Sequence, residues 1–153
     1  MSVQQHTHDR SPAWRIGQVT AGHLLQNKRG PAGLVSIGPD QTVVEALVLL
    51  EGQELPELPV LEASCVVGNL SDLSLAREVH HGGYLGDKTV RQIMEPPLAQ
   101  VDVDADIHEV YRLLRGGQPG LIVTRGSTPV GFLNRVDLVD HWRRQTAWNG
   151  SGI

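Results

Sequence analysis

Cysteine, aromatic residues and long apolar runs are all scarce in this chain of 153 residues. Cys65 is the only cysteine, so no internal disulfide can form. Its position in "ASCVVG", at the start of a strand-like run, predicts a small apolar core residue. No apolar stretch approaches the roughly 18 residues of a membrane-spanning helix, and the first residues lack the apolar core of a secretory signal. The sequence therefore predicts a cytoplasmic protein that does not cross a membrane.

An excess of positive charge is also missing. Lysine and arginine number 13 against 17 aspartates and glutamates, which gives a net charge of -4. Such a chain has no electrostatic reason to bind nucleic acid or an anionic membrane, and aromatic residues (4%) are too few to form a base-stacking surface. The length suits one compact domain, or two very small units that stabilise each other by packing together.

Motifs for metal binding and catalysis are absent as well. The pairs His6/His8 and His80/His81 have no further ligands at metal-binding spacing, so they predict surface histidines and no metal site. The glycines of "HHGGYLG" lack the Lys-Ser/Thr ending of a phosphate-binding loop and predict a hinge. No Ser, Cys or Lys has a base and an orienting group in a recognisable motif, so the sequence predicts a protein that is not an enzyme.

What the sequence does contain is an internal repeat. Residues 42–50 ("TVVEALVLL") and 106–114 ("DIHEVYRLL") carry apolar side chains at positions i, i+3, i+4 and i+7, the spacing of one face of an amphipathic helix. Short β-like runs, "LVSIGPDQ" and "AQVDVDAD", precede the two helices. The chain therefore predicts a strand–turn–helix unit that occurs twice.

The second part of the repeat is a hairpin followed by a helix. Residues 57–75 ("ELPVLEASCVVGNLSDLSL") align without a gap on residues 120–138 ("GLIVTRGSTPVGFLNRVDL"). Each block predicts a strand, a tight turn, a second strand and a helix that begins at Ser71 or Asn134, both of which suit an N-cap. The lead-in segments "TAGHLL" and "TVRQIM" also match, each predicting a Thr-capped turn of helix.

These patterns predict an α+β fold of two β-α-β-β-α repeats that pack about a pseudo-twofold axis and form two related clefts. The predicted boundaries are a flexible N-terminal tail at 1–15, a first repeat at 16–86, a second repeat at 87–145 and a C-terminal tail at 146–153.

The two hairpin–helix blocks resemble the second half of cystathionine-β-synthase (CBS) domains, and the pair resembles a Bateman module. More narrowly, "VRQIMEPPLAQVDVDADIHEVYRLL" is similar to the regulatory C-terminal region of bacterial cystathionine β-synthases, whose catalytic domain has no counterpart here. The resemblance implies a non-catalytic regulatory module that binds an adenosine-containing ligand between its repeats. It implies no tightly bound cofactor.

In the family pattern a Gly is followed by a Ser or Thr and then by an Asp that holds the ribose hydroxyls. The second repeat keeps Gly131 and Asp137 but has Asn134 at the hydroxyl position. The resemblance implies that Phe132 and Val136 enclose adenine opposite Leu55, Glu57 and Leu58 of the first repeat. Arg135, at the start of the last helix, is a candidate partner for a phosphate or carboxylate, and Arg125 is a second one. Asp137 also lies where an acid would cap the last helix, so this reading stays open beside ribose binding.

The other cleft departs further from the family pattern. Ser71 keeps the hydroxyl position, but Ser74 replaces the aspartate. A second, weaker cleft is therefore predicted at Ser71, Ser74, Gly120 and Leu121.

The function expected from these residues is regulation of a partner protein, not identified by the sequence, through S-adenosylmethionine as first choice and AMP or ATP next. Asn134 in place of a hydroxyl residue favours a ligand without phosphates. A homodimer formed through helix faces is expected, and Trp142, on the same face of the last helix as Leu138, predicts a core or dimer contact. The alternative is a structural or dimerisation module in which both clefts are vestigial.

Overall fold

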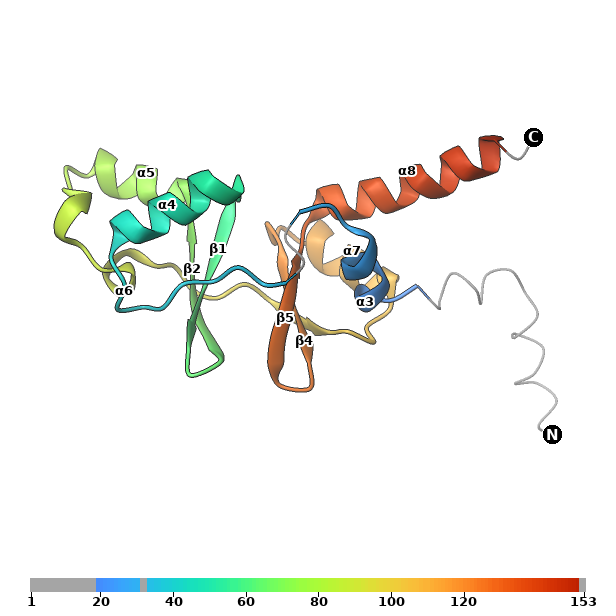
Figure 1. Cartoon of the computed structure of the whole chain (residues 1–153), viewed down its shortest axis with the longest axis horizontal. Helices are drawn as coiled ribbons and strands as arrows, with labels where there is room; N and C mark the ends of the chain where they lie inside the picture. The colour runs from blue at the N-terminus through green and yellow to red at the C-terminus, as the bar shows by residue number, and fades with distance from the viewer. Residues whose placement is uncertain (1–18, 31–32, 152–153) are drawn as a thin grey trace.

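The computed structural model describes residues 19–30 and 33–151, with side chains placed through residue 146. Two β-hairpins stand side by side, and helices cover the upper part of each in Figure 1. In chain order the elements are α3 (Ala21–Asn27), α4 (Val43–Gln53), β1 (Glu57–Glu62), β2 (Cys65–Ser71), α5 (Asp72–His80), the 3-10 turn η2 (Leu85–Asp87), α6 (Val90–Ile93), β3 (Gln100–Asp102), α7 (Ile107–Arg115), β4 (Leu121–Arg125), β5 (Thr128–Leu133) and α8 (Arg135–Ser151).

Local sequence signals explain where these elements begin and turn. Thr20, Thr42, Ser71 and Thr89 each stand before a helix and form a reciprocal capping box with the residue three positions later. In the first hairpin turn Ala63 and Ser64 have φ values of 52° and 68°, the left-handed conformation that matches the twist of the flanking strands. The predicted helix starts and hairpins are therefore present.

The two sheets share an antiparallel hairpin but differ in size, because one has two strands and the other has three. Strands β1 and β2 pair antiparallel, β4 and β5 do the same, and β3 adds a parallel strand beside β4. The run at 34–41 was expected to be the matching strand of the first repeat, but only Ile37 forms a bridge, to Val60. Gly38 and Pro39 follow directly, and proline has no N–H to continue a ladder.

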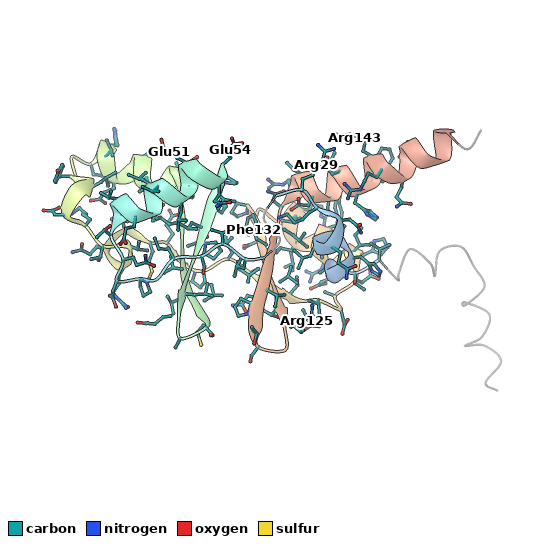
Figure 2. All side chains as sticks on the ribbon, viewed as in Figure 1. Arg29, Glu51, Glu54, Arg125, Phe132 and Arg143 are labelled. Carbon is teal, nitrogen blue, oxygen red and sulfur yellow. The ribbon has the colours of Figure 1, made fainter. Side chains whose placement is uncertain are left out.

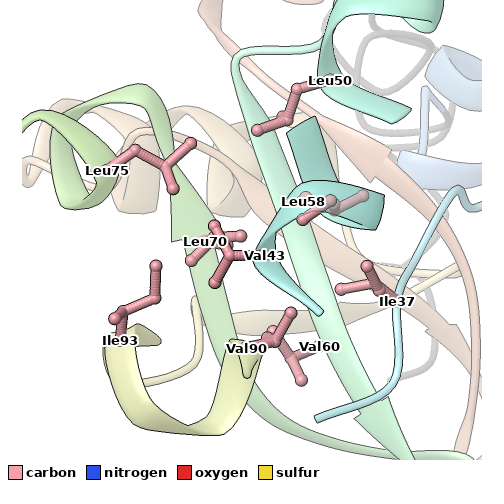
Figure 3. Close-up of a cluster of buried hydrophobic side chains, with 10 residues drawn as sticks. Ile37, Val43, Leu50, Leu58, Val60, Leu70, Leu75, Val90 and Ile93 are labelled. Carbon is pink, nitrogen blue, oxygen red and sulfur yellow. The ribbon is translucent and has the colours of Figure 1, made fainter. Parts of the chain in front are cut away.

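Each repeat has its own apolar core. The first is formed by α4, the β1–β2 hairpin, α5 and α6, and Figure 3 shows Val43, Leu58, Leu70, Val60 and Val90 converging within it. The second contains Val101, Val110, Leu114, Leu121, Val123 and Leu133, with Ala21 and Leu24 among them. The predicted apolar face of α4 is largely buried, whereas in α7 Val110 and Leu114 of the predicted face are buried but Tyr111 is 55% exposed.

The lead-in helices cross between the repeats, which differs from the predicted continuous boundaries. Ala21 and Leu24 of α3 lie in the second core, whereas Val90 and Ile93 of α6 lie in the first. Backbone bridges hold both crossings, from Thr20 to Asp106 and from Thr42 to Thr89. The two packing units therefore exchange their lead-in segments, and neither unit is a continuous stretch of chain.

A glycine at each strand break makes room for the crossing helix. A Cβ on Gly131 would lie 2.6 Å from the Leu25 side chain of α3, and a Cβ on Gly68 would lie 2.5 Å from Sδ of Met94, just after α6. A side chain at either glycine would therefore force the Leu25 or Met94 side chain to move. The matched glycines of the sequence repeat thus have matched structural roles.

Two predictions about the ends and the cysteine are corrected. Helix α8 continues to Ser151, so residues 146–151 are helical and not a separate tail; no proline interrupts this run. Cys65 is exposed at the first position of β2, next to the hairpin turn, and is not a core residue. The predicted tail at 1–15 lies outside the described residues. Within the described part of the chain, no helix is both long and apolar enough to span a bilayer.

Candidate functional site

A small cleft lies between the repeats where the sequence predicts the main ligand site. Its walls are formed by Leu25 and Lys28 at the end of α3, by residues 33 and 35, by Leu55, Glu57 and Pro59 around β1, and by Gly131 and Phe132 of β5. The free volume is about 30 Å³, roughly the space of one water molecule. Three of the predicted residues, Leu55, Glu57 and Phe132, are thus brought together from different repeats.

Asp137 is buried behind the cleft-lining Lys28, and its Oδ2 is engaged within the protein. It is 8% exposed, and its Oδ2 accepts a hydrogen bond of 2.8 Å from the backbone N–H of Asn134. Asn134 Oδ1 in turn accepts one of 3.2 Å from the backbone N–H of Asp137. The helix-cap reading of Asp137 is therefore correct for this conformation.

Lys28 provides the second partner of Asp137. Its Nζ lies 3.4 Å from Asp137 Oδ2, and the exposed fractions of the two side chains are 14% and 9%. The same ammonium donates a hydrogen bond of 2.6 Å to the carbonyl oxygen of Phe132 and lies 5.6 Å from the centre of the Phe132 ring. A positive charge of the protein itself therefore lies beside the carboxylate that the resemblance predicts to hold a ribose.

Other residues predicted for this site lie elsewhere. Leu58 is completely buried in the first core, so it cannot flank a ligand. Val136 is 61% exposed on α8, and Arg135 faces a different groove, because the first turn of α8 directs these side chains outward. Arg125 lies at the tip of the second hairpin, far from Phe132 between the repeats (Figure 2).

The second cleft is larger and has different chemistry. Its volume is about 570 Å³, and it is walled by four prolines, Pro56, Pro96, Pro97 and Pro119. We call it the proline-walled cleft. Carboxylates of Glu57, Asp72 and Glu95 line it together with Asn69 and Ser71. Glu57 therefore borders both clefts.

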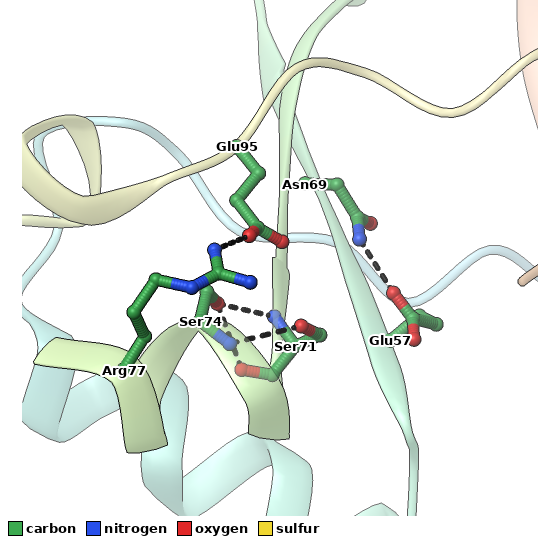
Figure 4. Close-up of polar contacts among 6 residues, drawn as sticks. All are labelled: Glu57, Asn69, Ser71, Ser74, Arg77 and Glu95. Carbon is green, nitrogen blue, oxygen red and sulfur yellow. Dashed lines mark hydrogen bonds and ion pairs between the residues drawn. The ribbon is translucent and has the colours of Figure 1, made fainter. Parts of the chain in front are cut away.

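The residues predicted for this weaker cleft are mostly structural. Ser71 and Ser74 bond reciprocally: each backbone N–H donates to the other's hydroxyl, at 2.8 and 3.1 Å (Figure 4). Gly120 and Leu121 are buried at the start of β4, behind Pro119. Of the four, Ser71 alone lines the cleft, and Ser74 completes the helix cap as Asp137 does in the other repeat.

Among the described carboxyl groups, Glu57 is the one whose pKa the fold raises. Burial raises the pKa of Glu57, the hydrogen bond of 2.5 Å from Asn69 Nδ2 opposes this, and the charges of Glu95 and Asp72 raise the pKa further. Figure 4 shows Asn69 meeting Glu57 and Arg77 meeting Glu95. Of the three carboxylates gathered here, Glu95 is paired with Arg77, whereas Glu57 and Asp72 belong to none of the ion pairs among the described side chains.

Glu57→Gln should stabilise the protein at neutral pH. Because the folded pKa lies above the unfolded one, the unfolded chain loses this proton first, and stability falls as pH rises through that interval. Glutamine can still accept the Asn69 hydrogen bond without the charge. We expect a higher Tm for the variant at pH 7 and equal values near pH 3.5, below the usual carboxyl pKa of about 4.3. A lower Tm at pH 7 would contradict this account.

A third hollow is an apolar groove between α7 and α8. It has a volume of about 700 Å³, and its lining includes Tyr111, Leu138, Val139 and Trp142. Tyr111, Val139 and Trp142 are 55%, 50% and 68% exposed. Such a stripe of exposed apolar side chains is typical of a protein interface. We call it the α7–α8 groove.

Among the described residues, no group of three or more His, Cys, Asp or Glu side chains is placed to hold a metal ion. Two residues important to the clefts were not found from the sequence. Lys28 stands in a connection that has no motif, and Asn69 occupies an ordinary strand position. The crossing of α3 places Lys28 beside Asp137, and no local pattern signals that crossing.

Comparison with known proteins agrees with this architecture. Residues 90–144 match the family model described as the CBS domain. No curated protein shows a significant sequence match. Among solved structures, the CBS domain NE2398 is 28% identical, with 80% of this chain and 95% of that chain covered and a TM-score of 0.71.

Three further structures, of two proteins, show the same fold at lower identity. A CBS-domain protein from Burkholderia ambifaria is 21% identical over 80% of this chain and 92% of its own, with a TM-score of 0.71. CBSX2 of Arabidopsis thaliana, a CBS-pair protein, is 23% identical over 84% and 96%, with a TM-score of 0.68. CBSX2 has also been solved in complex with AMP, and that structure covers 83% of this chain and 98% of its own at 24% identity, with a TM-score of 0.66.

The structures that match this chain are those of CBS-domain proteins, which are typically non-catalytic regulatory modules. The specific likeness to the regulatory region of bacterial cystathionine β-synthases has no support among these matches. The sequence of residues 90–144 thus matches the CBS domain family, and the chain as a whole has the fold of a CBS-domain pair.

Proposed function

We propose that this protein is a cytoplasmic regulatory module that binds an adenosine-containing ligand in the cleft beside Asp137. The observation that carries the proposal is the buried carboxylate of Asp137, 3.4 Å from the ammonium of Lys28, which lines the cleft together with Phe132 and with Leu55, Glu57 and Pro59 of the other repeat. A carboxylate accepts hydrogen bonds from two ribose hydroxyls, and a largely apolar wall suits a purine. Binding between the repeats would couple ligand occupancy to their relative position.

The cleft must open before it can hold such a ligand. Its free volume of about 30 Å³ is far below that of a nucleoside, and the Lys28 ammonium occupies the carboxylate. Ligand binding therefore exchanges the Lys28–Asp137 ion pair for ribose hydrogen bonds and moves the end of α3. A ligand that distinguishes the two arrangements shifts the population between them, which is the physical basis of regulation.

S-adenosylmethionine is the first candidate ligand, because Asn134 replaces the hydroxyl residue that would face a phosphate; AMP and ATP come next. The AMP complex of CBSX2 supports the adenosyl class in general. Calorimetric titration of the purified chain with all three compounds tests the proposal. Saturable binding of any one supports an adenosyl sensor, and absence of binding by all three contradicts it.

The regulated partner is a second protein, and the module is proposed to act as a homodimer. Apolar side chains are exposed on helices of both repeats: Val44 and Val48 on α4, and Val139 and Trp142 on α8. These helices lie along the same side of the molecule in Figure 1. Two copies that meet through these faces would cover the α7–α8 groove.

Trp142→Glu should convert this dimer to a monomer. A charge at the centre of an apolar interface would be desolvated without a partner, which is strongly unfavourable. Light scattering coupled to gel filtration measures the mass directly. Arg125→Glu, a charge change of two units against one for Trp142→Glu, lies at the exposed hairpin tip and should leave the dimer intact. A wild-type chain that is monomeric at high concentration would contradict the proposed assembly.

The alternative function is a structural or dimerisation module with vestigial clefts. The closed cleft and the engagement of Asp137 as a helix cap favour this reading. The ligand titration separates the two functions, because the alternative predicts a stable dimer that binds none of the three compounds.

A further inference from the structure

The proline-walled cleft departs from an adenosine site in both charge and shape. The acid that would hold a ribose is replaced by Ser74, whose hydroxyl donates a hydrogen bond to the carbonyl oxygen of Ser71, 2.8 Å away. Instead, the carboxylates of Glu57, Asp72 and Glu95 line the cleft. Of the lining residues that the structure describes, none is a Lys, Arg or His.

Two of these carboxylates have no ion-pair partner among the described side chains. Glu95 is paired with Arg77, whereas Glu57 and Asp72 belong to none of the ion pairs in this part of the structure. Burial is the main cause of the raised pKa of Glu57, and the negative charges of Glu95 and Asp72 raise it further. The cleft therefore has a negative field that would repel a nucleotide phosphate and attract a cation.

A buried polar atom gives an independent indication of a ligand. Asn69 lines the cleft and is 3% exposed, and among the residues that the structure describes its Oδ1 has no hydrogen-bond partner. The Nδ2 of Asn69 donates a hydrogen bond to Glu57 Oε1. The atom without a partner is therefore the acceptor Oδ1, on the same amide group that contacts the Glu57 carboxylate. A donor that enters next to Glu57 would satisfy both groups, and buried polar atoms are rarely left without a partner.

The form of the cleft decides between cations. No three acidic or imidazole groups in the described chain are placed to hold a metal ion, so a bare divalent cation does not fit. The volume of about 570 Å³ lies within the range of organic ligands, and four prolines with Leu73 and Leu98 give it an apolar lining. Spaced carboxylates over an apolar floor match an aliphatic chain that carries ammonium groups.

We propose that the proline-walled cleft binds an aliphatic organic cation of the diamine class, with ammonium groups at Glu57 and Asp72 and an N–H donated to Asn69 Oδ1. This site goes beyond the proposed adenosyl function: Glu57 borders both clefts, but Asp72 and Asn69 line only the proline-walled cleft. The protein would then bind two ligands of different charge, one in each cleft between its repeats.

The experiment is an NMR titration of the full-length protein with putrescine, following the side-chain amide signals of Asn69. We expect saturable shifts at millimolar putrescine that weaken as salt is raised. The neutral isostere 1,4-butanediol should produce no saturable shift, and AMP should not compete. Absence of a saturable putrescine shift, equal binding of butanediol, or displacement by AMP would each overturn the proposal.

Variants locate the site. Glu57→Gln combined with Asp72→Asn should weaken putrescine binding by about tenfold or more, because both charge-assisted hydrogen bonds are lost. Glu51→Gln, which removes an exposed carboxylate from α4, and Asp137→Ala should leave putrescine affinity unchanged. Unchanged affinity in the double variant overturns the proposal. A Tm measured for each variant verifies that the fold is intact, and loss of adenosyl binding alone would leave this inference standing.

Discussion

Asp137→Ala should weaken binding of the adenosine-containing ligand by about tenfold or more, equivalent to about 1.4 kcal/mol. The variant removes the acceptor proposed for the ribose hydroxyls, and nothing else in the cleft supplies a carboxylate at that position. Calorimetric titration of wild type and variant with the same ligand measures the effect. Equal affinity in the variant would leave Asp137 as a helix cap only.

The helix cap has to be separated from the ligand contact, because Asp137→Ala also removes the hydrogen bond from the Asn134 N–H. Losing such a cap costs about 1 kcal/mol of stability, so a lower Tm is expected as well. Asp137→Asn keeps an oxygen for the cap and loses the charge. Weaker ligand binding with a nearly wild-type Tm in this variant assigns the carboxylate a role in binding.

Lys28→Met provides the matched control on the other side of the ion pair. Methionine retains the apolar length of the side chain but leaves Asp137 free for the ligand. Because binding no longer has to break the Lys28–Asp137 contact, affinity should rise relative to wild type. A fall in affinity would show that Lys28 holds the ligand and does not compete with it.

Leu24→Ala should lower the free energy of unfolding by about 2–5 kcal/mol, the usual cost of a large-to-small change in a core. Leu24 is 1% exposed and lies in the second core beside residues such as Val110 and Leu121. Denaturant unfolding measures the loss. Gln26→Ala, on the exposed face of the same helix, should have little effect.

The same variant tests the crossing of the lead-in helices. Methyl signals of Val110 and Leu121 should shift in Leu24→Ala, whereas those of Leu58 and Val60 in the first core should not. The opposite pattern would mean that α3 packs on the repeat that follows it in the chain. A loss of stability below about 1 kcal/mol would also contradict the packing described.

Much of the secondary structure was predictable because its signals are local. The Thr and Ser caps, the apolar spacing of α4 and α7 and the tight turns at Ala63–Ser64 and Gly126 act within a few residues, and all lie where the sequence predicts them. The internal repeat then implied two similar units. The match of residues 90–144 to the CBS domain is consistent with that reading.

The candidate site was predictable only in part. Phe132, Leu55 and Glu57 meet in one cleft as expected, because the hairpins of the two repeats face each other. Leu58 and Val136 do not join them, since strand and helix positions one residue apart point to different sides. Such reversals depend on how each element is rotated, which residue types alone do not specify.

By itself the sequence determined the repeated units and the starts of their helices. It also showed that Asp137 and Ser74 occupy equivalent positions in the two repeats. Only the tertiary structure decided that α3 and α6 exchange places, that Lys28 closes one cleft and that Glu57, Asp72 and Asn69 line the other. The reason is physical: caps and periodicity arise from neighbours along the chain, whereas pairing across clefts follows from burying two small cores at once.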